Sequence, residues 1–165
     1  MNNVSIHITR RTFKGSFFAF TWEQYKLDNI LRTNGFKEFI KLPESFGKYP
    51  VIQQGDQPQS GYANGAPFEN YDNVVLFGDH TVSLFKPSEP FFLATDGLKI
   101  LNSDYTTRDF LYYLLIKSKP EQQGYTRHYS MLKEMNISIP NKIEQQIIAA
   151  LFNKLDNLIT LHQRK

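Results

Sequence analysis

Polar side chains that can read the edges of nucleic-acid bases are concentrated in one long segment, residues 55–73. Gly, Pro, Gln, Asn and Ser occupy most of its positions, and it follows an apolar run. Gln and Asn can form paired hydrogen bonds with adenine in the major groove, where each good pair discriminates by about 1–3 kcal/mol. Solvated loops prefer the same residue types, so composition alone leaves both interpretations open. The candidate DNA-facing side chains in and just before this segment are Gln53, Gln54, Gln57, Ser60 and Tyr62.

A second polar stretch, residues 121–129, has the same character and adds a guanidinium group. Arg127 could bind guanine or a backbone phosphate, and the alternative is again a surface loop. Two such stretches in one chain favour DNA binding over solvation alone. The candidates here are Arg127, His128 and Tyr129, and Lys86 and Lys133 are candidates for phosphate contacts.

Asp79 and His80 form an adjacent carboxylate and imidazole pair, which could be a metal site or a general base. Neighbouring residues in a strand–turn–strand segment tend to point apart, and no second His lies at ligand spacing. A metal or catalytic site is therefore disfavoured, and a simple turn is the alternative. The favoured interpretation has His80 and Thr81 face DNA at the rim of a sheet.

Motifs of catalysis are missing from the sequence. Neither a P-loop nor a paired-glycine fingerprint for dinucleotides is present. A metal-dependent nuclease needs two or three carboxylates and a Lys, of which Asp96 and Lys99 offer only a fragment. We expect no catalytic residue and no cofactor bound by this chain. A nuclease that uses Asp79, His80 and Asp96 is the alternative from another class, and a phage or host interaction protein that binds no DNA is a third.

The composition is that of one soluble globular domain. Hydrophobic residues make up 41% and charged residues 21% of the 165 positions, which disfavours disorder and allows one core with a projecting element. The net charge of +3 favours a polyanionic partner without requiring one. The absence of Cys excludes disulfides and thiolate zinc sites and suits a cytoplasmic protein. The longest apolar run, residues 110–116, is shorter than the roughly 20 residues that a membrane helix needs.

The elements that would position the polar stretches begin with an amphipathic helix over residues 22–31, predicted from a Thr21–Gln24 capping box and ended by Gly35. Short apolar runs broken by Gly, Pro, Asn and Asp then predict strands and turns up to residue 101. The predicted strands are Tyr49–Gln53, Val74–Phe77, Val82–Phe85, Phe91–Ala94 and Leu98–Ile100, with turns at Gly78–Asp79 and Asp96–Gly97. Residues 55–73 are expected to form a long loop.

Thr106 or Thr107 is expected to cap a second helix that runs to about Lys117 and is largely buried. A short helical turn near Met131 and a strand over residues 136–139 follow. This order predicts a mixed α+β fold, a small twisted sheet with flanking helices followed by a long C-terminal helix. The expected parts are a flexible arm (1–16), a globular domain (17–140) and the terminal helix (141–165).

The terminal helix carries an apolar stripe at spacings of three and four residues, as helix packing requires. Such a stripe packs more often on its own domain than on a partner. The helix follows Pro140 at the end of the globular part and begins with charged and amide residues, which favours a projecting helix that pairs with a second one. The residues expected at that contact are Ile148, Leu151, Leu155 and Leu158.

Four stretches in this order resemble the target-recognition half of type I restriction-modification specificity subunits. They are WEQYKL, YPVIQQGDQPQSGY, VVLFGDHTVSLF and IPNKIEQQIIAALFNKLDNLI, and the likeness spans about residues 13–165. The last stretch is the most specific, because family members run from a strand ending in Pro into a helix with this pattern. The matching residues are Pro140, Glu144, Gln145, Gln146, Leu155, Asp156, Leu158 and Ile159.

The resemblance implies a non-catalytic domain for recognition of double-stranded DNA, with a spacer helix that places adenine methyltransferase subunits and a restriction subunit on a bipartite site. It also implies that S-adenosylmethionine is bound by the methyltransferase partner. The usual member holds two recognition domains and two helices, so this chain is expected to be a natural half-subunit or an excised fragment. Homodimerisation, or pairing with a second recognition half through the terminal helix, would restore the pattern. A helix of about 20 residues spans roughly 30 Å, close to one turn of duplex DNA.

Overall fold

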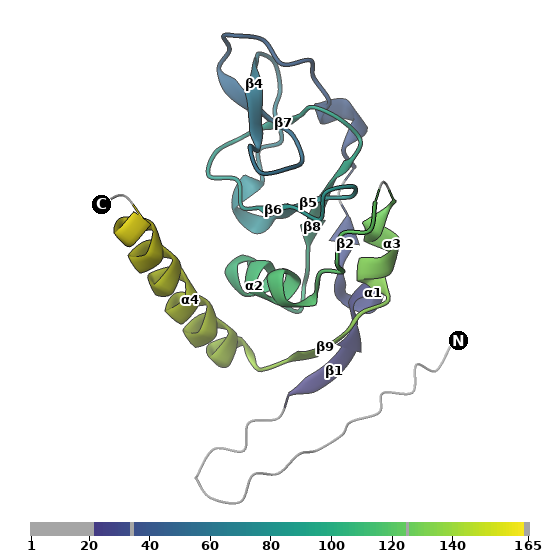
Figure 1. Ribbon diagram of the computed structural model, residues 1–165, viewed down its shortest axis with the longest axis vertical. Helices are drawn as coiled ribbons and strands as arrows, with labels where there is room; N and C mark the ends of the chain where they lie inside the picture. The colour runs from purple at the N-terminus through teal and green to yellow at the C-terminus, as the bar shows by residue number, and fades with distance from the viewer. Residues whose placement is uncertain (1–21, 34, 125, 164–165) are drawn as a thin grey trace, which may run out of the picture.

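The computed structural model describes residues 22–33, 35–124 and 126–163, and the expected N-terminal arm lies outside them. Its mixed α and β architecture confirms the predicted fold class, with a long helix at the C-terminal end (Figure 1). The strands are β1 Glu23–Lys26, β2 Arg32–Thr33, β3 Tyr49–Ile52, β4 Gln59–Ala63, β5 Val75–Gly78, β6 Leu84–Phe85, β7 Phe92–Leu93, β8 Leu98–Asn102 and β9 Asn136–Ile139. The helices are α1 Leu27–Ile30, η1 Lys37–Phe39, η2 Tyr71–Asn73, α2 Arg108–Ser118, α3 His128–Lys133 and α4 Lys142–Gln163.

Three small sheets organise the domain. The largest has the strand order β2-β8-β5-β6, a second has the order β4-β3-β7, and β1 pairs with β9. Only β3 and β7 pair in parallel, and the other named pairs are antiparallel. The β3–β4 hairpin occupies one end of the molecule, and the β1–β9 ribbon lies toward the other (Figure 1).

Strand β5 lies between two hydrophobic clusters, which explains why its sequence is an unbroken apolar run. Val75 and Phe77 face the helical cluster, whereas Leu76 and the preceding Val74 face the cluster shared with the β3–β7 sheet. All four of these side chains are fully buried. Successive side chains of a strand point to opposite faces, so this one strand joins both halves of the core.

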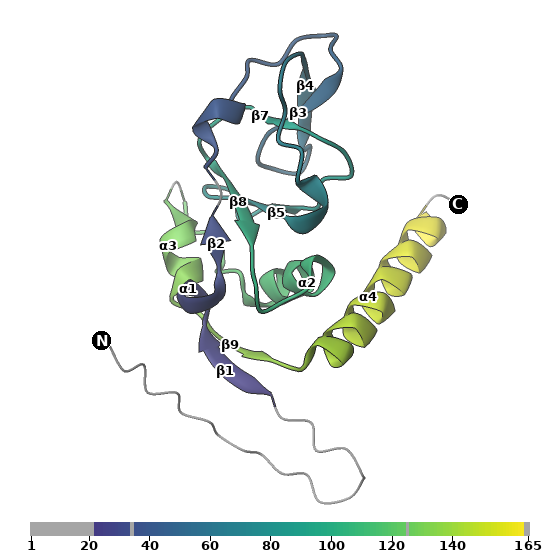
Figure 2. The same cartoon turned by 180° about the vertical axis from the view of Figure 1, so that it is seen from behind.

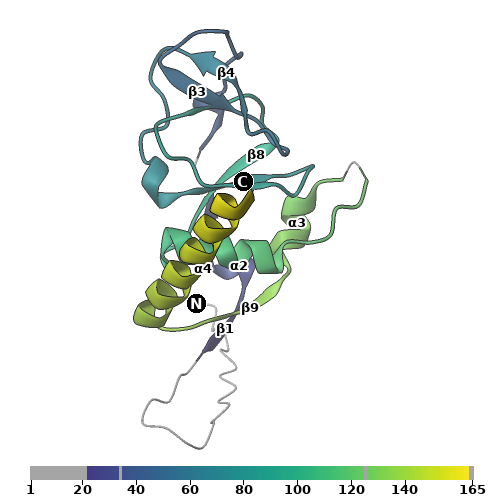
Figure 3. The same cartoon turned by 60° about the vertical axis from the view of Figure 1, so that its left-hand side comes forward.

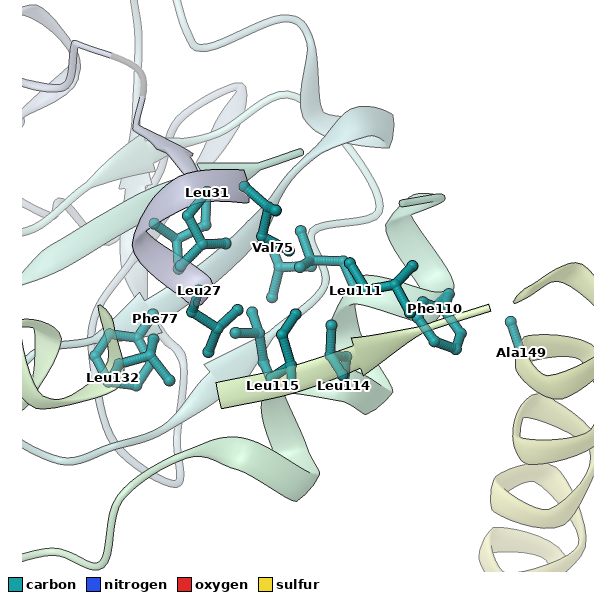
Figure 4. Close-up of a cluster of buried hydrophobic side chains, with 14 of the residues drawn as sticks. Leu27, Leu31, Val75, Phe77, Phe110, Leu111, Leu114, Leu115, Leu132 and Ala149 are labelled. Carbon is teal, nitrogen blue, oxygen red and sulfur yellow. The ribbon is translucent and has the colours of Figure 1, made fainter. Parts of the chain in front are cut away.

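The helical cluster holds the domain and the terminal helix together. Helices α1, α2 and α3 contribute Leu27, Leu115 and Leu132, all of which are fully buried (Figure 4). Ala149 of α4 is also part of this cluster and lies near Phe110 of α2. The N-terminal half of α4 is therefore packed against the domain.

The predicted helix over residues 22–31 is largely wrong. Glu23–Lys26 forms β1 and pairs with β9 in a register that sets Glu23 opposite Ile139, which leaves a single helical turn for the residues that follow. Backbone groups of this segment are satisfied by a strand far along the chain, since the N–H of Leu27 donates to the carbonyl of Met135 at 2.9 Å. Thr21 lies outside the described residues.

The expected long loop over residues 55–73 is also corrected, because it contains β4 and η2. Strand β4 pairs with β3 in a hairpin, with a register shift between Val51 and Ile52. Strand β6 is shorter than predicted, because Val82 has a φ of 56°, a left-handed conformation that a β-branched residue rarely adopts and that no strand continues through.

The later elements agree with the sequence. Thr107 caps α2, its hydroxyl oxygen accepting the N–H of Phe110 at 3.4 Å, and β9 spans the predicted residues. Helix α4 begins at Lys142 and runs for 22 residues. None of the helices in the described part of the chain has the length and apolar character needed to cross a membrane.

Candidate nucleic-acid interface

The side chain of Asp79 is the centre of the region where the two polar stretches meet. It follows β5 directly, and only 3% of its side chain is exposed. One carboxylate oxygen accepts the N–H of Tyr129 at 2.8 Å, and the other lies 3.9 Å from the ammonium of Lys99 and 3.8 Å from the guanidinium of Arg127. A buried carboxylate requires such partners, so Asp79 ties the second polar stretch to the end of the sheet.

His128 is fully buried, so the prediction that it faces DNA is wrong. Its Nδ1–H donates to the carbonyl of Asp79 at 3.0 Å, and its Nε2 accepts the N–H of Gln123 at 2.9 Å. A carbonyl can only accept, which assigns the proton to Nδ1. The imidazole is thus a bridge inside the protein that connects Gln123 to Asp79 at the end of β5.

Gln54 joins the first polar stretch to the same place. Its amide oxygen accepts the N–H of His80 at 3.0 Å, and its side chain lies against two glycines. A Cβ at Gly97 would lie 2.7 Å from the amide nitrogen of Gln54, and a Cβ at Gly78 would lie 2.8 Å from its Cβ. Gln54 positions the backbone of His80 through its amide oxygen, and contact of its half-buried side chain with DNA stays a prediction.

His80 connects the two stretches. Its Nδ1–H donates to the carbonyl of Thr126 at 3.1 Å, while its own N–H is held by Gln54. Three segments far apart in the sequence therefore lie side by side, and α3 stands next to the end of β5 in the ribbon diagram (Figure 1). The predicted residues that meet here are Gln54, His80 and Arg127.

The remaining candidates of the first stretch differ in the exposure and the hydrogen bonding of their side chains. Gln53 donates through its side-chain amide to the carbonyl of Gln57 at 3.0 Å, which orders the loop and leaves the Gln57 side chain exposed. Ser60 donates its hydroxyl to the carbonyl of Val51 at 3.0 Å. Tyr62 is 39% exposed on β4. Among these four candidates, Gln57 and Tyr62 are thus the ones with exposed side chains.

Two further candidates are engaged with neighbouring side chains. The hydroxyls of Thr81 and Ser83 are 2.8 Å apart. The ammonium of Lys133 lies 2.8 Å from a carboxylate oxygen of Asp28. That contact raises the pKa of Lys133 and lowers the pKa of Asp28, so both groups stay charged at neutral pH.

The structure adds residues that the sequence analysis missed. Phe36, Lys37 and Lys99 line a cleft together with Arg127 and Tyr129. The ammonium of Lys99 lies 5.0 Å from the centre of the Phe36 ring, within the range of a cation–π contact. The position of Lys99 between two apolar strand residues was the available signal, since alternation turns it away from the core.

The alternative nuclease site is not assembled in the described part of the chain. No group of three or more His, Asp or Glu residues there could hold a metal ion. Asp79 is occupied by Tyr129, Lys99 and Arg127, as described above. Asp96 is exposed, and its backbone carbonyl accepts the ammonium of Lys99 at 3.0 Å.

Helix α4 has two different faces. Gln145 and Ala149 are buried against the domain, whereas Leu151, Leu155 and Leu158 are 56%, 43% and 60% exposed. Ile148 departs from the predicted stripe, because it is half-buried against the helical cluster of its own domain. The C-terminal turns of α4 stand away from the rest of the described chain (Figure 2). An unpartnered apolar face of this size is typical of an interaction surface.

Comparison with models of protein families identifies the family of this chain. Residues 20–165 match the family model described as type I restriction modification DNA specificity domain. The chain is a member of the type I DNA specificity domain family. The match includes the recognition region and all of α4, so the resemblance found in the sequence is confirmed.

The fold of this specificity domain agrees with a solved structure. It is similar to the crystal structure of the type I restriction-modification system S subunit from M. genitalium, with a TM-score of 0.61 and 22% identity. The alignment covers 86% of this chain and 42% of the S subunit, so the chain spans less than half the length of that protein. A search of curated proteins found no match.

Proposed function

We propose that this chain recognises a specific sequence in double-stranded DNA, as half of the specificity subunit of a type I restriction-modification complex. Membership of the DNA specificity domain family supports the recognition role. The coverage of 42% of the S subunit supports the half-subunit role. In this proposal the chain performs no catalysis and acts in the cytoplasm beside DNA.

The observation that carries the proposal is the meeting of the two polar stretches at the end of β5. Gln54, His80 and Thr126 link them through hydrogen bonds of 3.0 and 3.1 Å. Arg127 keeps 67% of its side chain exposed beside this junction, and Gln57 is exposed on the first stretch. Base readout needs amide and guanidinium groups that are held by ordered backbone yet open to solvent, and these two residues meet both conditions.

The finer part of the proposal concerns partners. The chain would assemble with a restriction subunit and with adenine methyltransferase subunits, which bind S-adenosylmethionine. A second copy of the chain would recognise the other half of the bipartite DNA site. The exposed apolar face of α4 supports the pairing, with Leu151, Leu155 and Leu158 at its centre. Two such helices packed side by side would separate the two recognition domains by a fixed length.

Selection of duplexes from a random library, with the chain bound to its methyltransferase subunit, tests the proposal. Gln57→Ala should then weaken binding to the selected duplex by about 1–3 kcal/mol and binding to unrelated duplex much less. Gln163→Ala, which alters an exposed Gln at the end of α4, is the matched control. Equal enrichment of all sequences in the library would refute specific recognition, and equal losses on both duplexes would refute base readout by Gln57.

A further inference from the structure

The cleft beside Asp79 has a composition that the recognition loops do not explain. It has a volume of about 860 Å³ and is bordered by residues 35–38, by the start of β8 and by α3. Four cationic side chains line it, and two carboxylates accompany them. The cationic residues are Lys37, Lys99, Arg127 and Lys133, and the acidic ones are Glu38 and Asp79.

We infer that this cleft is a binding site for a phosphodiester of the DNA backbone, with Lys37 and Arg127 as the contacting cations. The inference rests on the proposed function and adds a ligand class and residues to it. A contact to the backbone carries no sequence information, but it fixes the register of the protein on the duplex. The cleft adjoins the base-reading region through Arg127, which belongs to both.

The balance of charge favours an anion. Asp79 is neutralised from within, because its carboxylate accepts a backbone N–H and lies beside Lys99 and Arg127. Lys133 is paired with Asp28, at 2.8 Å. Lys37 is exposed and forms no ion pair among residues 22–33, 35–124 and 126–163. The cleft therefore keeps positive charge that its own carboxylates do not offset.

Lys99 is built into the cleft rather than placed at its rim. Only 13% of its side chain is exposed, and its ammonium is fixed by the carbonyl of Asp96 at 3.0 Å and by the Phe36 ring. Because it cannot move toward a ligand without losing these contacts, it adds a fixed positive potential. Charges fixed in a partly dry cleft act more strongly on an anion than mobile surface charges do.

The walls also suit a sugar–phosphate strand better than a base edge. Phe36 and Tyr129 supply apolar ring surface for a deoxyribose, and burial raises the pKa of Tyr129, so its phenol keeps a proton to donate. A base edge presents donors as well as acceptors. The four cationic side chains of the cleft can only donate, which suits the oxygens of a phosphodiester, while the hydroxyls and the two carboxylates of its lining are able to accept.

The salt dependence of DNA binding by the full chain tests the inference. Lys37→Gln should reduce the slope of log K against log salt by about 0.9, the value for one lost phosphate contact. The reduction should be the same on selected and unrelated duplexes. Lys117→Gln is the matched control, because it removes the same charge from an exposed position on α2 and should leave the slope unchanged.

The outcomes separate this inference from the proposed function. Equal slopes for Lys37→Gln and Lys117→Gln would overturn the cleft site even if the chain selects a DNA sequence. A reduced slope with no selected sequence would support the cleft and refute the proposed function. A chain that gives NMR shifts at Lys37 and Arg127 with inorganic phosphate but none with duplex would overturn the inference in favour of a free anion.

Discussion

His128 illustrates how a residue suited to DNA contact can instead hold a loop in place. Both ring nitrogens are used inside the protein, one toward Asp79 and one toward Gln123, at 3.0 and 2.9 Å. The buried imidazole thereby connects the second polar stretch to the end of β5. In the proposed function, its contribution to DNA binding would therefore be indirect, through the position of Arg127.

Replacement of this imidazole should loosen the whole second stretch. His128→Ala leaves the backbone N–H of Gln123 without its ring acceptor, at a cost of about 1–3 kcal/mol where that group stays buried, whereas the carbonyl of Asp79 keeps the backbone N–H of residue 128 at 2.8 Å. We expect a lower free energy of unfolding in urea and faster amide exchange at Gln123. Gln122→Ala, which alters an exposed position in the same polar stretch, is the control. Slow exchange at Gln123 in the variant would contradict the bridging role.

At the scale of elements, the contact between α2 and α4 is unusually polar. Asn153 of α4 accepts from the ammonium of Lys86 at 3.0 Å and from the hydroxyl of Tyr113 at 2.7 Å, and its amide nitrogen donates to Asp109 at 3.1 Å. Phe152 stacks on the Tyr113 ring at 4.9 Å. Figure 3 shows α4 crossing in front of α2. Hydrogen bonds are directional, so this contact should set the angle of α4.

Asn153→Leu should allow the angle between α4 and α2 to vary while α4 stays helical. We expect a broader distance distribution between spin labels at Glu89→Cys and Gln163→Cys, measured after dilution into unlabelled protein. The chain has no Cys of its own, so only the introduced sites react. Asn157→Leu, on an exposed position of the same helix, should keep the narrow distribution. Identical distributions in the two variants would argue against a role for Asn153 in orientation.

The same contact predicts a loss of stability at alkaline pH. Burial, helped by the hydrogen bond to Asp156, raises the pKa of Tyr113 above its ordinary value of 10.0. Above that pH the unfolded chain binds fewer protons than the folded chain, so the free energy of unfolding falls as pH rises. Urea unfolding at pH values on both sides of 10 measures the fall, and Tyr113→Phe should make it smaller. A variant with an unchanged pH dependence would show that other groups cause it.

At the scale of the whole molecule, the two faces of α4 are the basis of the proposed pairing of two recognition domains. One face of the helix is packed on the domain through Gln145, Ala149 and Asn153. The other face, which includes Leu151 and Leu155, is exposed. This division leaves one side of the helix for a second copy or a second recognition half.

A double variant tests the proposed pairing. Leu151→Glu with Leu155→Glu places charges where two apolar faces would meet, so we expect a monomeric mass by light scattering where the wild-type chain is dimeric. Binding to a single half-site should remain. Asn157→Glu adds one of the same charges away from the stripe and should leave the dimer intact. A wild-type chain that is monomeric at high micromolar concentration would contradict the pairing.

The sequence by itself determined the elements whose signals are local. Neighbouring residues predicted a cap of α2 at Thr106 or Thr107, the apolar period of that helix, the strands β3, β5 and β9, and the terminal helix α4. Each of these depends on hydrogen bonds or side-chain spacing within a few residues. The same kind of signal marked both polar stretches as candidates.

Only the tertiary structure decided which polar groups remain free and what surrounds them. Residues 23–26 form a strand because their backbone partners lie in β9. The His128 ring is hydrogen-bonded to the carbonyl of Asp79, and the amide oxygen of Gln54 to the N–H of His80. The cleft joins Phe36 to Lys99 and Tyr129, and no local pattern encodes that meeting. Burial and pairing between distant segments depend on how the whole chain packs, because a buried polar group must find a partner wherever the fold provides one.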